Sequence, residues 1–191
     1  METTLDDTRR TLYIGRFQVF HLGHLDVIQT MAAAADVDEI VVAVGSAQYD
    51  HERKHPSAPW SVNPFTIEER LEMMERSLEG KIIKPYALHP VPDYHDWQKW
   101  YQHIERELPP CFCLYSSDAK ERAFFEDQGY ETRGFSRRYS FHAGSLRVDL
   151  AEGNDIQDSV PAGALAVLER IDAGRRMREL LQRDEDEAAQ R

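Results

Sequence analysis

Apolar and polar residues along the first part of the chain follow the pattern of a strand, a helix and a second strand. A short apolar run at 11–15 ends in a glycine, and residues 21–35 form a stretch rich in Leu, Ile, Met and Ala that predicts a helix. The run 39–45 is β-branched without polar alternation, which is typical of a strand buried on both faces. This order predicts a parallel βαβ unit.

Helix and strand patterns alternate as far as residue 134. Ile67, Leu71 and Met74, for example, recur at the spacing of one helix face. The further expected elements are a helix at 66–78, a strand at 81–91, a helix at 97–108, a strand at 111–116, a helix at 118–127 and a short strand at 130–134. The order predicts an α/β fold with a doubly wound parallel sheet, in which ligands bind beyond the carboxyl ends of the strands.

Two regions interrupt this alternation. Residues 46–65 form a long, polar, proline-containing connection, which predicts a flap that closes over a substrate. From residue 145 the pattern is helical with a break at Val160-Pro161, and the polar tail at about 176–191 is expected to fray. We therefore expect one domain over 1–191, with a core of about 11–175.

Composition and charge narrow the classes of function. Asp and Glu number 34 against 23 Lys and Arg, giving a net charge of −11, which disfavours general nucleic-acid binding because the chain repels the phosphate backbone. No segment approaches the roughly 20 apolar residues that cross a bilayer, and the start lacks the apolar core of a signal peptide, so we expect no membrane partner and a cytoplasmic protein. Cys111 and Cys113 lie one residue apart on a predicted strand, a spacing that fits neither a disulfide framework nor the usual zinc sites.

The strongest chemical motif directly follows the first predicted strand and reads GRFQVFHLGH. His21 and His24 lie three residues apart at the expected helix start, so their imidazoles share a face near the positive end of the helix dipole, where they can hold phosphate oxygens. Gly15 permits a sharp turn, Gly23 permits close approach of a ligand or a neighbouring element, and Arg16 adds a planar cation suited to phosphate. The alternatives are ordinary helix-start histidines and a zinc site, for which no third ligand lies nearby.

This motif resembles the H-x-G-H signature of the nucleotidylyltransferase superfamily. The full string closely resembles the G-R-F-Q-P-F-H-x-G-H of archaeal-type nicotinamide-nucleotide adenylyltransferases, with Val19 in place of proline, and Arg16 and Gln18 favour this branch. Similar segments extend over about residues 11–175. They are GSAQ at 45–48, NPFT at 63–66 with Glu69-Arg70, the helix that carries Trp100, Arg138-Tyr139 and Val160-Pro161.

The resemblance implies a Rossmann-like nucleotidylyltransferase fold with C-terminal helices. It implies an enzyme that joins ATP and nicotinamide mononucleotide to give NAD and pyrophosphate, with Mg²⁺ bound through the ATP phosphates and a homo-oligomeric assembly. The expected catalytic residues are His21, His24, Arg16 and Arg147. The expected substrate-binding residues are Gly15, Phe17, Gln18, Gly23, Ser46, Arg70, Trp100, Arg138, Gly144 and Ser145.

Several of these residues also have a structural interpretation. Thr66 with Glu69 three positions later predicts a capping box, and Arg70 is either a surface residue or part of the nucleotide pocket. Trp100, or Trp97 if the local alignment slips, could stack on the flat, cationic nicotinamide ring or simply belong to the core. Phosphate contact and plain solvation both remain open for four residues of the long connection, His51, Arg53, Lys54 and His55.

The segment from Arg133 to Arg147 is basic, with no Asp or Glu, in an otherwise acidic chain. It predicts an anionic partner at the sheet edge that carries the histidine motif, the alternative being a solvated basic face. The family's Ser-x-Thr-x-x-Arg signature is altered here. Alignment on Arg147 places His142 at the serine and Gly144 at the threonine, whereas alignment on Tyr139 keeps Ser140 but leaves two extra residues. The Gly144 N–H at a helix N-terminus, with Ser145 or His142 as a further donor, preserves a triphosphate site.

Three functions remain open at this point. They are the transfer of an adenylyl group to nicotinamide or nicotinic acid mononucleotide, an adenylyl or cytidylyl transfer to a different phosphate acceptor, and the binding of nucleotides by a non-catalytic sensor. The altered segment at 142–145 motivates the sensor, whereas Gln18 and Trp100 speak against a different acceptor.

Overall fold

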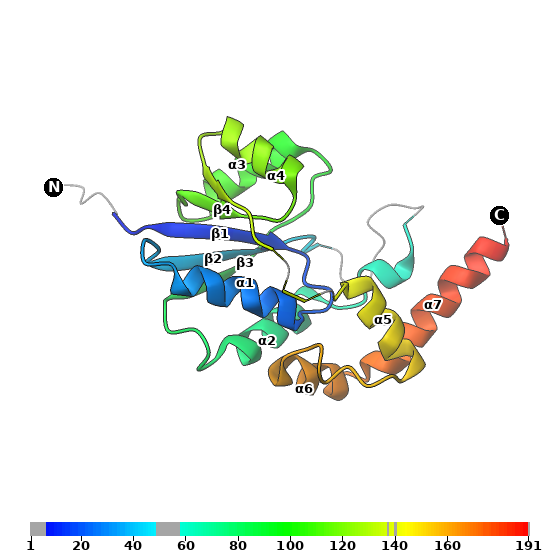
Figure 1. Cartoon of the computed structure of the whole chain (residues 1–191). Coiled ribbons are helices and arrows are strands. Elements are labelled where there is room, and N and C mark those ends of the chain that lie inside the picture. The colour runs from blue at the N-terminus through cyan, green and yellow to red at the C-terminus, as the bar shows by residue number, and fades with distance from the viewer. Residues whose placement is uncertain (1–6, 49–57, 137, 140, 191) are drawn as a thin grey trace.

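The structure is a computed structural model that describes residues 7–48, 58–136, 138–139 and 141–190. Its centre is a five-stranded, all-parallel sheet in the order β3-β2-β1-β4-β5 (Figure 1). The strands are β1 (Arg10–Gly15), β2 (Glu39–Val44), β3 (Tyr86–Pro90), β4 (Cys113–Tyr115) and β5 (Glu131–Arg133). The helices are α1 (Leu22–Ala33), α2 (Ile67–Leu78), α3 (Trp97–Glu107), α4 (Ala119–Asp127), α5 (Ala143–Glu152), α6 (Ala162–Arg170) and α7 (Ala173–Ala189), with a 3₁₀ turn η1 (Trp60–Val62).

Helices cover both faces of the sheet, which confirms the predicted doubly wound α/β class (Figure 1). On one face Leu12 and Val41 pack with Phe125 of α4 and with Ile104 of α3. On the other face Val42 joins the core cluster formed with α1, α2 and the C-terminal helices. Because neighbouring residues of β2 enter opposite clusters, this strand needs apolar side chains at every position, which explains its unbroken β-branched run.

The strand predicted at 81–91 is shorter in the structure and begins only at Tyr86. Its expected first half is a turn, in which Ile83 is fully exposed. The Lys84 ammonium donates to the carbonyl oxygens of Ala34 and Val37, each at 2.5 Å, and so fastens the turn to the end of α1. Pro85 follows and has no N–H to donate to a ladder.

The polar tail expected to fray is helical instead, as α7 runs to Ala189. Arg176 pairs with Glu69 at 2.6 Å, and Met177 is buried. Further along, Asp184 accepts from the backbone N–H of Trp60 at 2.5 Å. Hydropathy does not predict this docking, because Arg176 and Asp184 fasten the tail through polar contacts. Among the residues that the structure describes, no helix is long and apolar enough to span a membrane.

Candidate active site

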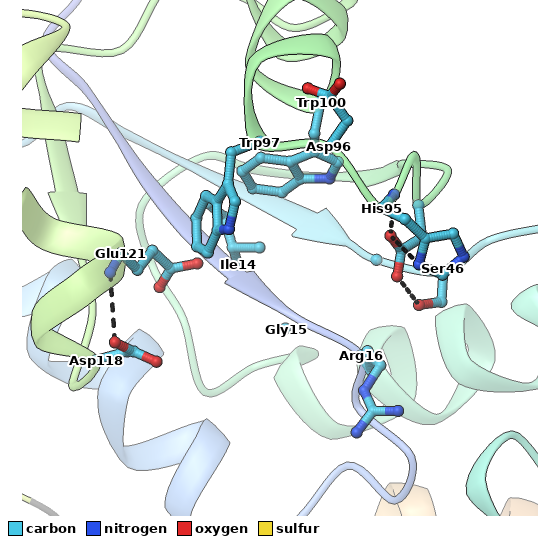
Figure 2. A pocket seen from close by; sticks show the side chains of 12 residues that line it. Ile14, Gly15, Arg16, Ser46, His95, Asp96, Trp97, Trp100, Asp118 and Glu121 are labelled. Atoms are coloured by element: carbon cyan, nitrogen blue, oxygen red, sulfur yellow. Dashed lines mark hydrogen bonds and ion pairs between the residues drawn. The ribbon is translucent and has the colours of Figure 1, made fainter. Parts of the chain in front are cut away.

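Two cavities open at the carboxyl edge of the sheet, and Arg16 lines both. The first, which we call the basic cavity, has a volume of about 340 Å³ and is lined by the start of α1, the segment before α5 and the first turn of α5. The second, which we call the acidic cavity, has a volume of about 760 Å³ and lies between the ends of β1 and β2 and the starts of α3 and α4 (Figure 2). Both lie beyond the strand ends, where ligands bind in this class of fold.

The loop between β1 and α1 is held by its own buried side chains. Phe17 and Gln18 are only 2% and 3% exposed and line neither cavity. The Gln18 amide pairs with the backbone of Phe65, donating to its oxygen at 2.9 Å and accepting from its nitrogen at 3.0 Å. A Cβ on Gly15 would lie 2.8 Å from the Phe17 ring, so the tight turn requires glycine there. Phe17 and Gln18 thus shape the loop from behind.

The two histidines of the motif form one stacked unit. Their ring centroids lie 3.6 Å apart with planes 19° from parallel, and the His21 backbone N–H donates to His24 Nδ1 at 3.2 Å. Because Nδ1 accepts this bond, the proton of a neutral His24 ring lies on Nε2, which is then a donor. A Cβ on Gly23 would lie 3.0 Å from the His21 ring. Gly23 therefore leaves room for the His21 imidazole, which packs closely against it.

Arg147 enters the basic cavity from α5 and lies close to Arg16. Its Nη1 donates to the backbone oxygen of Gln18, while its Nε is buried with no hydrogen-bond partner in the described part of the chain. Burial and the positive charge of Arg16 lower the pKa of Arg147 to about 10, so it still carries its charge at neutral pH. An anion bound between these two cations would relieve their repulsion and compensate the desolvation of Arg147.

The rest of the basic segment divides between the cavity and the surface. Arg138 lines the basic cavity but is largely exposed and lies 3.6 Å from Asp26. Gly144 lines it at the first turn of α5, whereas Ser145 is exposed and lies outside it. Arg133 lines neither cavity, because it pairs with Asp36 at 2.5 Å and lowers the pKa of that carboxyl to about 2. Arg133 therefore already has the anionic partner that the basic segment predicts.

The acidic cavity combines aromatic and carboxylate side chains (Figure 2). Trp97 and Trp100 of α3 meet edge to face with ring centroids 6.3 Å apart, and both line the cavity. Ser46, at the end of β2, lines it too and donates to Asp93 at 3.4 Å. Four carboxylates lie around this space, and the motifs of the sequence singled out none of them. They are Asp93, Asp96, Asp118 and Glu121.

Arg70 is fully buried and lines neither cavity. Its guanidinium donates to the carbonyl oxygens of Arg16 at 2.9 Å and Gly45 at 2.7 Å, so it joins the ends of β1 and β2. The alternative that Arg70 is a surface residue is therefore wrong. The predicted capping box of Thr66 and Glu69 is confirmed, with the Glu69 N–H donating to the Thr66 hydroxyl at 3.2 Å and the Thr66 N–H to the Glu69 carboxylate at 2.9 Å.

Comparison with known proteins places this site in a family. Residues 12–129 match the family model described as cytidylyltransferase-like. The chain is 36% identical over 93% of its length to the nicotinamide-nucleotide adenylyltransferase of Methanolobus tindarius, of which it covers 98%. The chain belongs to the cytidylyltransferase-like family, in its nicotinamide-nucleotide adenylyltransferase branch. The family predicted from the first motif is thereby confirmed.

A second relative agrees with this assignment, and a solved structure shares the fold. The enzyme of the same name from Thermoplasma volcanium is 33% identical over 93% of this chain and 95% of its own. The fold is shared by a bifunctional NMN adenylyltransferase/ADP ribose pyrophosphatase from Francisella tularensis, solved with AMP and a manganese ion, at a TM-score of 0.66 and 23% identity. The alignment covers 92% of this chain but about half, 52%, of that longer one.

The structure brings most of the predicted site residues of this adenylyltransferase-family chain to the two cavities. The basic cavity gathers Arg16, His21, Gly23, His24, Arg138, Gly144 and Arg147, and the acidic cavity gathers Gly15, Arg16, Ser46 and Trp100. Phe17, Gln18, Arg70 and Ser145 line neither. The role of each residue in binding or catalysis remains a prediction. Residues 49–57 of the predicted flap lie outside the described residues.

Proposed function

We propose that this protein transfers the adenylyl group of ATP to nicotinamide mononucleotide, giving NAD and pyrophosphate. The names of the relatives that are similar over nearly the whole chain support this reaction. The structural observation that carries the proposal is the pair of cations Arg16 and Arg147, which face one small cavity with no carboxylate bonded to either in the described structure. A polyphosphate supplies the missing negative charge.

The reaction needs no nucleophile from the protein. An oxygen of the mononucleotide phosphate attacks the α-phosphorus of ATP, and a new P–O bond forms as the bond to the β-phosphate breaks. Pyrophosphate leaves with that electron pair. The protein then acts by aligning the two phosphates and by stabilising the charge that shifts toward the leaving group.

The basic cavity supplies donors for that charge from α1, from α5 and from Arg16 in the loop after β1. His24 presents its Nε2 edge with its Nδ1 already engaged by the His21 backbone, so its orientation is fixed before the substrate binds. Arg147 comes from α5, and the free N–H groups of the first turn of that helix, at Gly144, add their dipoles. We assign the α- and β-phosphate oxygens to the histidines and the β/γ end to Arg16 and Arg147.

The basic cavity is suited to a metal that arrives with the nucleotide. Asp26 is the carboxylate that lines it, and this residue lies 3.6 Å from Arg138. Among the described residues no three His, Cys, Asp or Glu side chains lie together as a metal site. We expect Mg²⁺ held by the ATP phosphates, where it would neutralise charge on the leaving pyrophosphate.

The acceptor nucleotide fits the acidic cavity, which begins on the other side of Arg16. Trp100 and Trp97 offer indole faces to the flat, positively charged nicotinamide ring, and such faces attract cations. Arg16 lies where the phosphate of this acceptor would meet the ATP phosphates. A homo-oligomer, a cytoplasmic location and the absence of nucleic-acid or membrane partners also remain our predictions.

Pyrophosphate release by the purified protein with Mg²⁺ and ATP, with and without nicotinamide mononucleotide, tests this function, with the dinucleotide identified by mass. We expect release that depends on the mononucleotide and yields one NAD for each pyrophosphate. Release with another phosphate acceptor only would reassign the acceptor. Binding of both nucleotides without any release would identify a sensor and refute the enzyme.

A further inference from the structure

Glu121 has an unusual place at the start of α4. It is the third residue of this helix, a position from which a glutamate ordinarily reaches back to the backbone N–H of the N-cap residue. Here the N-cap Asp118 donates its N–H to the Ser116 hydroxyl at 3.0 Å instead. That hydroxyl in turn donates to Glu121 Oε2 at 2.5 Å. Ser116 thus takes over the capping role and ties down one oxygen of the Glu121 carboxylate.

The second oxygen of this carboxylate, Oε1, receives no hydrogen bond from the described residues. Figure 2 shows the carboxylate pointing into the acidic cavity, on the side of Trp97 and Ile14. No cation forms an ion pair with Glu121 in the described structure, while Asp118 lies on the same helix turn. Burial, with the charge of Asp118, raises the pKa of Glu121. The fold therefore keeps an uncompensated carboxylate in the wall of a cavity, which is typical of a functional site.

The neighbours of Glu121 in this wall also favour a cation. The indoles of Trp97 and Trp100 meet edge to face at 6.3 Å and form a corner in the same cavity. Indole faces and a carboxylate together make a site for a flat organic cation. The two pyridine mononucleotides differ in this respect. The nicotinamide ring carries one positive charge, whereas nicotinic acid adds a carboxylate that cancels this charge and would lie close to other carboxylates.

We propose that Glu121 selects the acceptor by charge, so that the site takes nicotinamide mononucleotide and rejects nicotinic acid mononucleotide. This inference rests on the proposed function, since it assigns the base of the acceptor to the acidic cavity. Glu121 attracts the pyridinium ring and repels the additional carboxylate. A like charge a few ångströms away, in the mixed dielectric of a cavity wall, changes affinity by about tenfold.

The test compares kcat/KM for the two mononucleotides at saturating ATP and Mg²⁺. Glu121→Gln keeps the size of the side chain and can still accept from Ser116 through its amide oxygen. The matched control is Glu126→Gln, which removes the same charge from the same helix outside the cavity. Asp118→Asn is a second variant that preserves the N-cap and removes a more exposed charge.

We expect the unmodified protein to favour nicotinamide mononucleotide by at least about tenfold and Glu121→Gln to reduce that preference by about tenfold. The change should lie in KM, which rises for nicotinamide and falls for nicotinic acid mononucleotide. Asp118→Asn should shift the ratio less, and Glu126→Gln should leave it unchanged. An unchanged ratio in folded Glu121→Gln, or an equal loss with both acceptors as expected for a ribose contact, would overturn the proposal.

A binding measurement separates this inference from the proposed reaction. Quenching of tryptophan fluorescence by each mononucleotide gives the two dissociation constants without turnover. If neither dinucleotide forms but Glu121→Gln still shifts the ratio of dissociation constants, the proposed function fails and the charge selection stands. If NAD forms but Glu121→Gln changes neither the ratio of kcat/KM values nor the ratio of dissociation constants, the function stands and the charge selection fails.

Discussion

The basic and acidic cavities share Arg16 and one sheet edge, yet they carry opposite charge. Arginines and histidines from α1 and α5 surround the first, and four carboxylates with two indoles surround the second. A net charge of −11 gives no hint of this division, because it averages over the whole surface. Each cavity thus matches the charge of one half of the proposed reaction, with polyphosphate on one side and a cationic base on the other.

The largest expected effect comes from removing a donor of the basic cavity without disturbing its backbone. In His24→Asn the amide oxygen can take the place of Nδ1 and still accept from the His21 N–H. The shorter side chain has no atom at the Nε2 position, so that donor is lost. We expect turnover to fall about 100- to 1,000-fold, because one transition-state donor is lost. His24→Gln, which has an amide nitrogen near the Nε2 position, should retain more. Single-turnover NAD formation measures both, and near-normal turnover in folded His24→Asn would refute the role of His24.

A second change tests whether the charge of the basic cavity serves ATP alone. Arg147→Met removes the guanidinium that lies against Arg16, and we expect kcat/KM for ATP to fall about 100-fold. The KM for the mononucleotide should stay within a few-fold. Arg138→Ala is the control, because this residue is largely exposed near Asp26 and should affect ATP less. Steady-state kinetics in both substrates distinguish these outcomes, and an equal loss in both variants would contradict the placement of Arg147.

The converse change tests the acidic cavity. Trp100→Leu removes an indole face while keeping an apolar side chain, so we expect the KM for nicotinamide mononucleotide to rise about tenfold. The KM for ATP should not change. Trp97→Leu should have a smaller effect, because Trp97 is half exposed. If Trp100→Leu instead lowered thermal stability and left both KM values unchanged, the indole would be a core residue only.

The smallest effect is on stability. Because Glu121 has a raised pKa in the fold, its carboxyl binds more protons in the folded than in the unfolded chain just above the ordinary value of 4.5. The contribution of Glu121 to stability therefore falls as pH rises through this window, and Glu121→Gln should abolish that contribution. We expect the melting temperature of Glu121→Gln to exceed that of the unmodified protein at pH 7 and to converge with it below pH 4.5. If Glu121→Gln melted at a lower temperature than the unmodified protein at pH 7, the Glu121 carboxylate would not be uncompensated.

Local sequence patterns predicted most of the helices and strands and the main residues of the basic cavity. The histidine motif and Arg147 lie where the order of elements predicts, because strand ends and helix starts are fixed by local patterns. Arg70 and Glu121 could not be assigned in this way. The buried position of Arg70 depends on three carbonyl oxygens that follow two strand ends. The second oxygen of Glu121 is left without a hydrogen bond because the Ser116 hydroxyl accepts the N–H of the N-cap residue. A signal for Glu121 did exist, since it follows the end of β4 closely.

The docked tail and the shortened third strand show the same limit. Asp184 accepts from the Trp60 N–H, 124 positions earlier in the sequence. The Lys84 ammonium donates to the Ala34 carbonyl at the end of α1. Hydropathy registers neither of these polar contacts. Tertiary hydrogen bonds therefore override the local expectation at these two places.

Calorimetric titration of each ligand separately shows whether the two cavities divide the substrates. ATP with Mg²⁺ and nicotinamide mononucleotide would be titrated into the unmodified protein, Arg147→Met and Trp100→Leu. We predict that Arg147→Met weakens ATP and retains the mononucleotide, whereas Trp100→Leu weakens the mononucleotide and retains ATP. Equal weakening of both ligands in each folded variant, or the reverse assignment, would contradict the account.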